Sequence, residues 1–210
     1  MTGRANAALV CMLALAGCAP HLQRAVVSAP VPAVLGPTAT PAAPTARAWV
    51  VTPSEARFEL RAHNALVDQV FTFRSFRARA TPTEDGSFAF HAEVDTSSLQ
   101  GGGIGMASFV KNRLLEVSTY PEATFDGTVQ RASAPGACGV QGTLRLHGVE
   151  RALRFDGTLE QEAETLHLHA VFDLPRKPFN VRLAGVLDGF VPENIGVLLD
   201  VHARRAPPSP

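Results

Sequence analysis

The sequence predicts an all-β domain with one short helix, built as an antiparallel sandwich or a closed barrel. At least seven segments alternate apolar and polar residues, as strands with one dry and one wet face do. Turn signals such as Glu84-Asp85-Gly86 and Pro135-Gly136 separate these segments. One further segment repeats apolar residues every three or four positions, which predicts the helix.

The chain begins with a predicted lipoprotein signal peptide over residues 1–17. Arg4 supplies the positive charge, and the apolar run 7–15 is shorter than the about 20 residues that span a bilayer. Leu15-Ala16-Gly17-Cys18 resembles the lipobox of bacterial lipoproteins. This resemblance implies cleavage before Cys18 and its lipidation with acyl chains such as palmitate. Two or more such chains hold a protein stably on a membrane.

This anchor places the mature protein in the cell envelope. We expect it to face the periplasm, and Ala19 after the cysteine favours the outer membrane over the inner one.

Residues 18–47 are predicted to form an extended tether, and residues 205–210 a disordered tail. The tether has prolines at 20, 30, 32, 37, 41 and 44 and no apolar period of 2 or 3.6. Such segments prefer polyproline II at about 3.1 Å per residue, which gives a reach on the order of tens of ångströms. The tail is also proline-rich. One domain, residues 48–204, remains between them.

The charge balance and the cysteine count of the chain exclude some classes of function and of fold stabilisation. The chain has 19 basic and 19 acidic residues, so it lacks the basic footprint of a nucleic-acid-binding protein. Cys11 leaves with the signal and Cys18 is acylated, so Cys138 alone remains in the domain and no internal disulfide is expected. Cys138 follows a Pro-Gly turn, where we interpret it as a small residue at a strand start rather than a nucleophile.

The alternating segments carry most of the aromatic residues on their apolar face. The predicted strands are 57–63, 71–74, 88–95, 140–147, 153–159, 166–174 and 195–203. The predicted helix has Met106, Phe109, Val110, Leu114 and Val117 on one face, Gly101-Gly102-Gly103 before it and Tyr120-Pro121 after it. Such a helix can plug one end of a barrel or lie on the outside, and the sequence leaves both open.

Several motifs then resemble a known family. Residues 114–125 resemble its FFDVxxYPxATF motif, and residues 142–153 resemble its GxLTIHGVTxPV motif. Shorter matches lie at 95–99 and 176–181. Over roughly residues 49–203 the chain is similar to the YceI-like family of periplasmic polyisoprenoid-binding proteins. The resemblance implies an eight-stranded antiparallel lipocalin-like barrel with a helix near one end. It also implies a long isoprenoid inside, such as a quinone tail or a polyprenyl lipid, and allows a homodimer.

The predicted function is a membrane-tethered carrier or reservoir for an apolar lipid. An eight-stranded barrel can hold one small ligand, and an apolar chain gains about 25 cal/mol per Å2 of surface removed from water. The residues expected to line the barrel are Phe58, Phe71, Phe73, Phe88, Phe90, Phe109, Leu114, Phe125, Leu144, Phe155 and Phe172. The alternative is that these side chains fill a dry core and the barrel is a scaffold for envelope interactions.

The chain departs from the family at the expected head-group end. Residues 105–109 lack the family's polar set and histidine, residues 67–71 lack its glycine, and Pro178 and Asn180 replace an aspartate and a glycine. These differences favour a simple apolar chain over a polar-headed isoprenoid.

Catalytic and metal functions are not predicted. His167 and His169 lie roughly 7 Å apart on one face of a strand, but that face is polar and no third ligand can be assigned. We expect His147 to hydrogen-bond its turn and Asp95 to cap one. No nucleophile elbow, phosphate loop or zinc motif is present.

Overall fold

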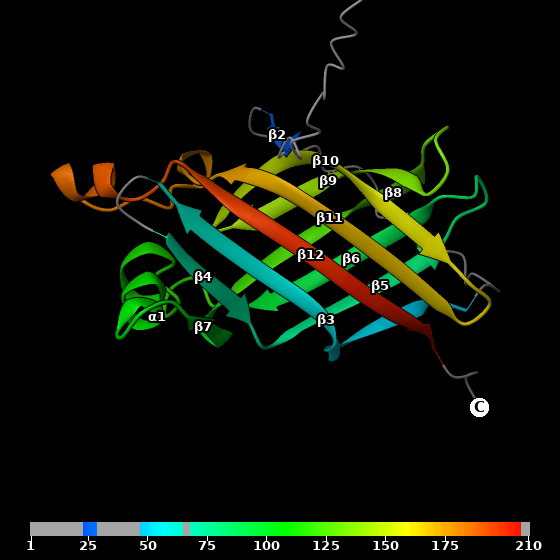
Figure 1. Cartoon of the computed structure of the whole chain (residues 1–210), viewed down its shortest axis with the longest axis horizontal. Helices are drawn as coiled ribbons and strands as arrows, with labels where there is room; N and C mark the ends of the chain where they lie inside the picture. Colours follow the sequence, from blue (N-terminus) through cyan, green and yellow to red (C-terminus); the bar gives the residue numbers. More distant parts are fainter. Residues whose placement is uncertain (1–22, 29–46, 65–67, 207–210) are drawn as a thin grey trace, which may run out of the picture.

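The computed structural model describes residues 23–28, 47–64 and 68–206, which form a closed antiparallel barrel with helical segments at one end (Figure 1). Its eight strands are β3 (Trp49–His63), β5 (Phe76–Pro82), β6 (Phe88–Asp95), β8 (Glu122–Arg131), β9 (Ala137–Leu146), β10 (Val149–Gln161), β11 (Thr165–Pro175) and β12 (Asn194–Arg205). The short strand β4 (Asp68–Phe73) pairs with the second half of β3, and β7 (Leu99–Gly101) pairs with β4. The predicted fold class is confirmed.

The barrel closes because its last strand pairs with its first. β12 is antiparallel to β3, with Val197 opposite Leu60 and Leu199 opposite Phe58. Each remaining strand pairs with its neighbour in the order β3, β5, β6, β8, β9, β10, β11, β12. The sandwich alternative is therefore wrong.

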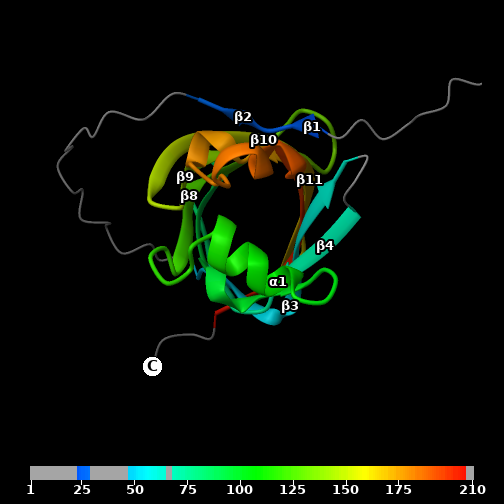
Figure 2. The ribbon, with the colours of Figure 1, turned by 90° about the vertical axis from the view of Figure 1, so that its left-hand side faces the viewer.

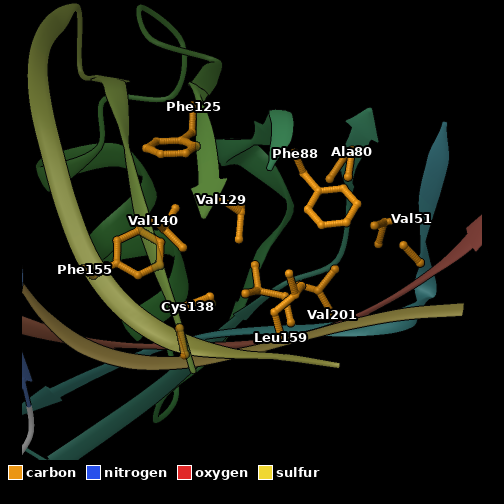
Figure 3. Packing of buried hydrophobic residues seen from close by; sticks show 14 of the residues in the cluster. Val51, Ala80, Phe88, Phe125, Val129, Cys138, Val140, Phe155, Leu159 and Val201 are labelled. Carbon is orange, nitrogen blue, oxygen red and sulfur yellow. The ribbon is translucent and has the colours of Figure 1, made fainter. Parts of the chain in front are cut away.

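Alternation places the apolar side chains inside. On β11, Leu166, Leu168, Ala170 and Phe172 are buried, and the residues between them are less so. Figure 3 shows this core, with side chains from several strands meeting inside the barrel. Near the ends of β3 and β6, the Trp49 and Phe88 rings meet edge to face with their centroids 5.5 Å apart.

Helical segments cover the opposite end (Figure 2). Helix α1 (Met106–Phe109) continues into a π-helical turn, Val110–Leu114, and so ends earlier than predicted. Glu116 stops it with a left-handed φ of 46°. Leu114 and Leu115 are buried against the barrel end, so the helix plugs the barrel rather than lying on its outside.

Three short 3-10 helices lie in the connections between strands. They are η1 (Thr96–Ser98), η3 (Lys177–Phe179) and η4 (Gly185–Phe190). Asp95 caps η1 by accepting a hydrogen bond from the Ser97 backbone N–H at 2.9 Å, as expected.

Part of the predicted tether belongs to the barrel wall. Strand β1 (Gln23–Arg24) runs parallel to β11, and β2 (Val26–Val27) runs antiparallel to β10. β10 and β11 pair with each other only over 158–161 and 166–169, so residues 23–28 occupy the seam between their other halves. Ala25, between the two short strands, is 3% exposed. An isolated Ala-Val-Val run is too short to show a period, and the sequence analysis missed it.

The predicted tail also begins too early. β12 continues through Arg205, whose guanidinium lies 4.4 Å from the centre of the Trp49 ring. The signal peptide, Cys18, the tether residues 29–46 and the tail residues 207–210 lie outside the described residues.

Candidate ligand-binding cavity

The barrel encloses an apolar cavity of about 190 Å3. It runs from the middle of the barrel to the helical end. Its lining is Phe58, Leu60, Phe73, Phe76, Ala78, Phe90, Ala92, Val94, Thr96, Leu115, Ala123, Thr124, Phe125, Val140, Leu144, Leu146, Leu153, Phe155, Leu168, Phe172, Leu174, Arg176, Val181, Ile195, Val197, Leu199 and Val201. Every strand of the barrel contributes, because each turns alternate side chains inward.

Seven of the predicted lining residues do line this cavity. They are Phe58, Phe73, Phe90, Phe125, Leu144, Phe155 and Phe172. Their rings form pairs: Phe155 and Phe172 stack with centroids 4.1 Å apart, and Phe58 lies 5.0 Å from Phe73. The aromatic alternation therefore identified a continuous apolar wall.

The other four lie elsewhere. Phe71 and Leu114 are buried in a second apolar cluster under the helical end. Phe88 lines a much smaller void at the Trp49 end, and Phe109 is 38% exposed on α1. Phe71 alternates correctly with Phe73 on β4, but it lies opposite Leu60, one step nearer the helical end, where it packs in the second cluster.

The sequence analysis also missed lining residues. Leu60, Leu174 and Leu199 lie on alternating strands that were identified, and weighting leucine like phenylalanine would have found them. Leu115 and Val181 had no such signal, because they reach the cavity from the helical segments at its end.

Three polar residues line the cavity, and the side chains of two of them, Thr96 and Arg176, form hydrogen bonds within the protein. The third is Thr124. The Thr96 hydroxyl donates to the Tyr120 carbonyl at 2.7 Å, inside the 95–99 and 114–125 motifs.

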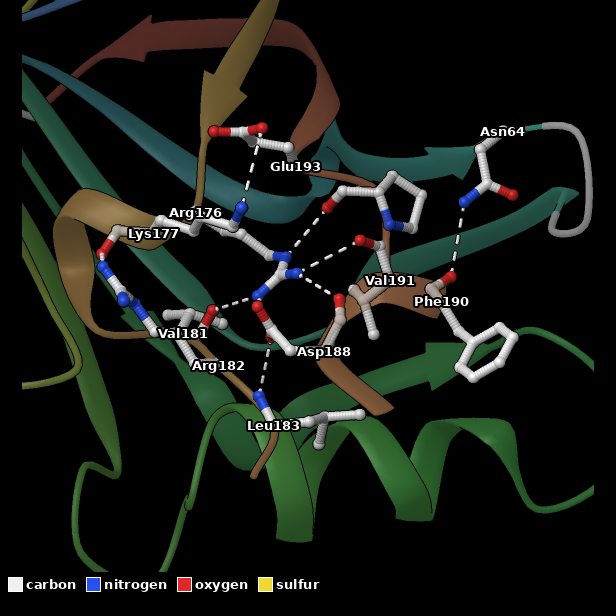
Figure 4. Close-up of polar contacts among 11 residues, drawn as sticks. Asn64, Arg176, Lys177, Val181, Arg182, Leu183, Asp188, Phe190, Val191 and Glu193 are labelled. Atoms are coloured by element: carbon white, nitrogen blue, oxygen red, sulfur yellow. Dashed lines mark hydrogen bonds and ion pairs between the residues drawn. The ribbon is translucent and has the colours of Figure 1, made fainter. Parts of the chain in front are cut away.

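Arg176 is the centre of a polar network at the helical end (Figure 4). Its side chain is 3% exposed, and its guanidinium donates to the carbonyls of Val181, Asp188, Val191 and Pro192. Nη1 also lies 2.6 Å from Asp188 Oδ1. This hydrogen bond holds the pKa of the Asp188 carboxyl below its usual value. Arg176 therefore fixes the loop that carries η4 and has its donors occupied within the protein.

The cavity size and lining define what it can accept. A cavity of about 150 Å3 lined by leucine, isoleucine and phenylalanine binds benzene, so this one accepts a short apolar segment as it stands. A longer chain fits only if lining rings turn or the helical end moves. Because Thr96 and Arg176 are engaged in hydrogen bonds within the protein, the site suits hydrocarbon better than a polar head group.

His147 does not hydrogen-bond its turn, so that prediction was wrong. Neither ring nitrogen has a hydrogen-bond partner among the described residues. The ring instead packs on Tyr120, with centroids 4.2 Å apart, and Nε2 lies 3.8 Å from Glu116 Oε2. Its role here is packing between the two family motifs.

The polar faces of β11 and β12 carry a group of side chains that the sequence did not reveal. His167, Asp200 and His202 have ligand atoms within 4.8 Å of one another, close enough to hold a metal ion. His169 is not in this group. His167 Nε2 lies 2.7 Å from Asp200 Oδ1, and the His167 and His202 rings stack at 4.0 Å, inclined by 8°. A bound metal lies near the plane of each imidazole, so both stacked rings would have to turn. Hydrogen bonding and stacking account for the arrangement without an ion.

Comparison with sequence models of protein families gives one match. The sequence model of the YceI-like domain matches residues 49–203. A search of curated proteins finds no match. None of the described helices is long and apolar enough to cross a membrane.

Several solved structures are similar in fold. BcnA of Burkholderia cenocepacia is 19% identical with a TM-score of 0.66, over 72% of this chain and 98% of that one. A polyisoprenoid-binding domain from Saccharophagus degradans, implicated in plant cell wall breakdown, is 14% identical with a TM-score of 0.60, over 77% and 99%. The Campylobacter jejuni YCEI protein is 14% identical with a TM-score of 0.58, over 69% and 90%.

Proposed function

Because the chain belongs to the YceI-like family, we propose that it binds one long apolar lipid chain, an isoprenoid or a similar hydrocarbon, inside its barrel. The observation that carries this proposal is the cavity, whose lining is apolar apart from two threonines and the committed Arg176. The similar fold of a polyisoprenoid-binding domain supports the ligand class. The function is binding and release, with no chemical step.

The proposal includes attachment to a membrane. Cys18 would carry the acyl chains, and the barrel would face the periplasm from the outer membrane. Anchoring keeps an apolar-ligand binder near the lipids from which its ligand would come.

Ligand extraction and uptake test this proposal. Native mass spectrometry of the purified mature protein should reveal an apolar ligand, and stripped protein should take up a quinone or a polyprenol saturably. Leu199→Trp should block uptake, because the larger ring fills space at the cavity wall. Val50→Trp is the matched control, since Val50 is 39% exposed on the outside of β3.

Two outcomes would count against it. One is the absence of both a copurifying ligand and saturable uptake. The other is equal uptake by the Leu199→Trp variant and the unaltered protein, which would place the ligand outside this cavity.

A further inference from the structure

The helical end of the barrel carries most of the exposed large apolar side chains. Among the described residues eight such side chains are exposed, and five of them form what we call the apolar rim: Ile104, Phe109, Val186, Leu187 and Phe190. Ile104 is fully exposed, and Val186 is 86% exposed. Large exposed apolar side chains that lie together mark an interaction surface, whereas single exposed ones are common on any protein.

The rim has two sides, one from each helical segment. Ile104 and Phe109 belong to α1 and the loop before it, while Val186, Leu187 and Phe190 belong to η4. Figure 2 looks onto this end and shows α1 and the orange η4 segment on opposite sides of the barrel opening. Figure 1 shows both at the same end of the molecule.

The rim lies directly outside the cavity. Leu115 follows the α1 side of the rim along the chain, Val181 precedes the η4 side, and both line the cavity. Leu114, Leu115 and Phe179 are buried in the apolar cluster under this end, so a chain that entered between the two sides would reach the cavity once these side chains moved aside.

The rim segments are basic, although the whole chain has no net charge. Residues 102–115 and 176–190 together contain Lys111, Arg113, Arg176, Lys177 and Arg182, and Asp188 is their one acidic residue. Arg176 already pairs with Asp188, and Lys177 Nζ lies 3.6 Å from Glu193 Oε2. Among the described residues, Lys111, Arg113 and Arg182 are the basic side chains of these segments that have no carboxylate partner. Apolar side chains beside unbalanced basic ones are the combination that binds anionic lipid surfaces.

The described N-terminal segment joins the barrel wall near the same end. Gln23 lies opposite Phe172 on β11, three residues before that strand ends at Pro175 and the chain enters η3. Only four residues lie between Cys18 and Gln23, and the five Cα–Cα steps between them span at most about 17 Å. A connection of this length would hold the barrel wall at Gln23 close to a membrane in which an acylated Cys18 is anchored, whichever end of the barrel faces that membrane.

We propose that the apolar rim docks on the surface of an anionic phospholipid bilayer and that ligand passes between bilayer and cavity at this end. The passage of ligand rests on the proposed function. The docking does not, because it follows from the apolar rim and the basic residues beside it.

Vesicle binding tests the docking directly. The chain from Ala19 to Pro210 lacks the acylated cysteine but contains every residue that the structure describes. It should float with vesicles of phosphatidylethanolamine and phosphatidylglycerol and bind vesicles of phosphatidylcholine more weakly. Replacing Val186, Leu187 and Phe190 with serine should weaken binding to the anionic vesicles about tenfold.

Two further variants separate apolar from electrostatic contacts. Arg113→Gln combined with Arg182→Gln should remove most of the preference for phosphatidylglycerol. Val50→Ser is the control, because Val50 is an exposed valine outside the rim, and its binding should match the unaltered chain. Saturable uptake of a detergent-solubilised polyprenol should be unchanged in every variant, which shows that each one folds.

Several results would overturn the docking. They are no binding of the unaltered chain to anionic vesicles, equal binding by the serine variant, or a concentration-dependent dimer that the serine variant abolishes while vesicles remain unbound. The last result would make the rim a contact between two copies. Vesicle binding without polyprenol uptake would contradict the proposed function and leave the docking standing.

Discussion

Cys138 illustrates how burial decides the chemistry of a residue. The side chain is 2% exposed within the main core, and burial raises the pKa of its thiol to about 11. The thiolate is the reactive form of cysteine, so the folded protein presents almost none of it at neutral pH. The sequence-based interpretation of Cys138 as a packing residue agrees with this environment.

We therefore expect Cys138 to resist a thiol reagent such as Ellman's reagent at neutral pH in the chain that begins at Ala19. The same chain should react fully in urea, where burial is lost. Rapid labelling of the folded chain at the rate of a free thiol would contradict the buried placement.

Arg176 acts on stability through its hydrogen bonds rather than through a ligand. Replacing it with methionine keeps much of the stem but leaves Asp188 and several carbonyls without their donor. Removing one partner of such a buried network should lower the free energy of unfolding by about 3 kcal/mol. Urea unfolding measures this, and Arg182→Met is the control because Arg182 is exposed and donates one backbone hydrogen bond, to Lys177.

The pair of Arg176 and Asp188 also predicts that the stability of the fold depends on pH in the acid range. The pKa of Asp188 is lower in the folded state than in the unfolded state. Ionised Asp188 therefore stabilises the fold above its unfolded pKa of about 3.9, and this stabilisation is lost as the pH falls through its folded pKa. The unaltered protein should therefore lose more stability below about pH 4 than Arg176→Met does. Parallel loss in both proteins would show that Asp188 does not depend on Arg176.

Asn180 shows why one departure from the family pattern is structurally mild. It stands where the family has glycine, and its φ is 58°, in the left-handed region. Asparagine adopts this region more readily than other residues with a side chain. The loop after η3 therefore keeps its turn without glycine.

At the scale of elements, β8 and β9 approach unusually closely where two glycines face each other. Gly127 pairs with Gly142, and a Cβ on Gly142 would lie 2.3 Å from the Asp126 carbonyl oxygen and 2.8 Å from the Phe125 ring. The Phe125 ring covers this pair from inside the barrel. The first glycine of the 142–153 motif is thus explained by strand packing.

Gly142→Ala should lower the free energy of unfolding by about 2 kcal/mol, because the strands must separate to admit the methyl group. Thermal or urea unfolding will show the change. Gly139→Ala on the same strand is the control, because a Cβ there would meet no atom closer than 3.8 Å. This substitution should change the free energy of unfolding little. Equal stability of the two variants would rule out the close contact.

The elements that were hard to predict share a physical cause. The inward positions of β5 include Ala78 and Ala80, and β8 has Gly127 between Phe125 and Val129. Small inward residues give little contrast in hydropathy, so these two strands were absent from the seven that alternation revealed. Strands with leucine or phenylalanine inside, such as β11, were predicted almost completely.

At the scale of the whole molecule, alternation predicted a sandwich or a barrel, the family resemblance implied the barrel, and neither predicted how the ends of the barrel are filled. Period-two patterning shows that a residue faces inward, yet it does not say whether that position fills a dry core or borders a cavity. Phe88 and Phe90 lie on the same strand, and only Phe90 lines the large cavity. The difference depends on neighbours such as Trp49, which are distant in sequence.

The pairing of β3 with β12 also sets the order of events in folding. The first long strand and the last one complete the wall together, so the interior stays open to water until residues near 205 have been made. Pairings between such distant segments form slowly, on a scale of milliseconds to seconds. A chain cut before β12 would leave β3 and β11 as unpaired edges around an apolar interior, which is a state prone to aggregation. In this barrel, the chain remains prone to aggregation until the twelve residues of β12 have paired with β3 and β11.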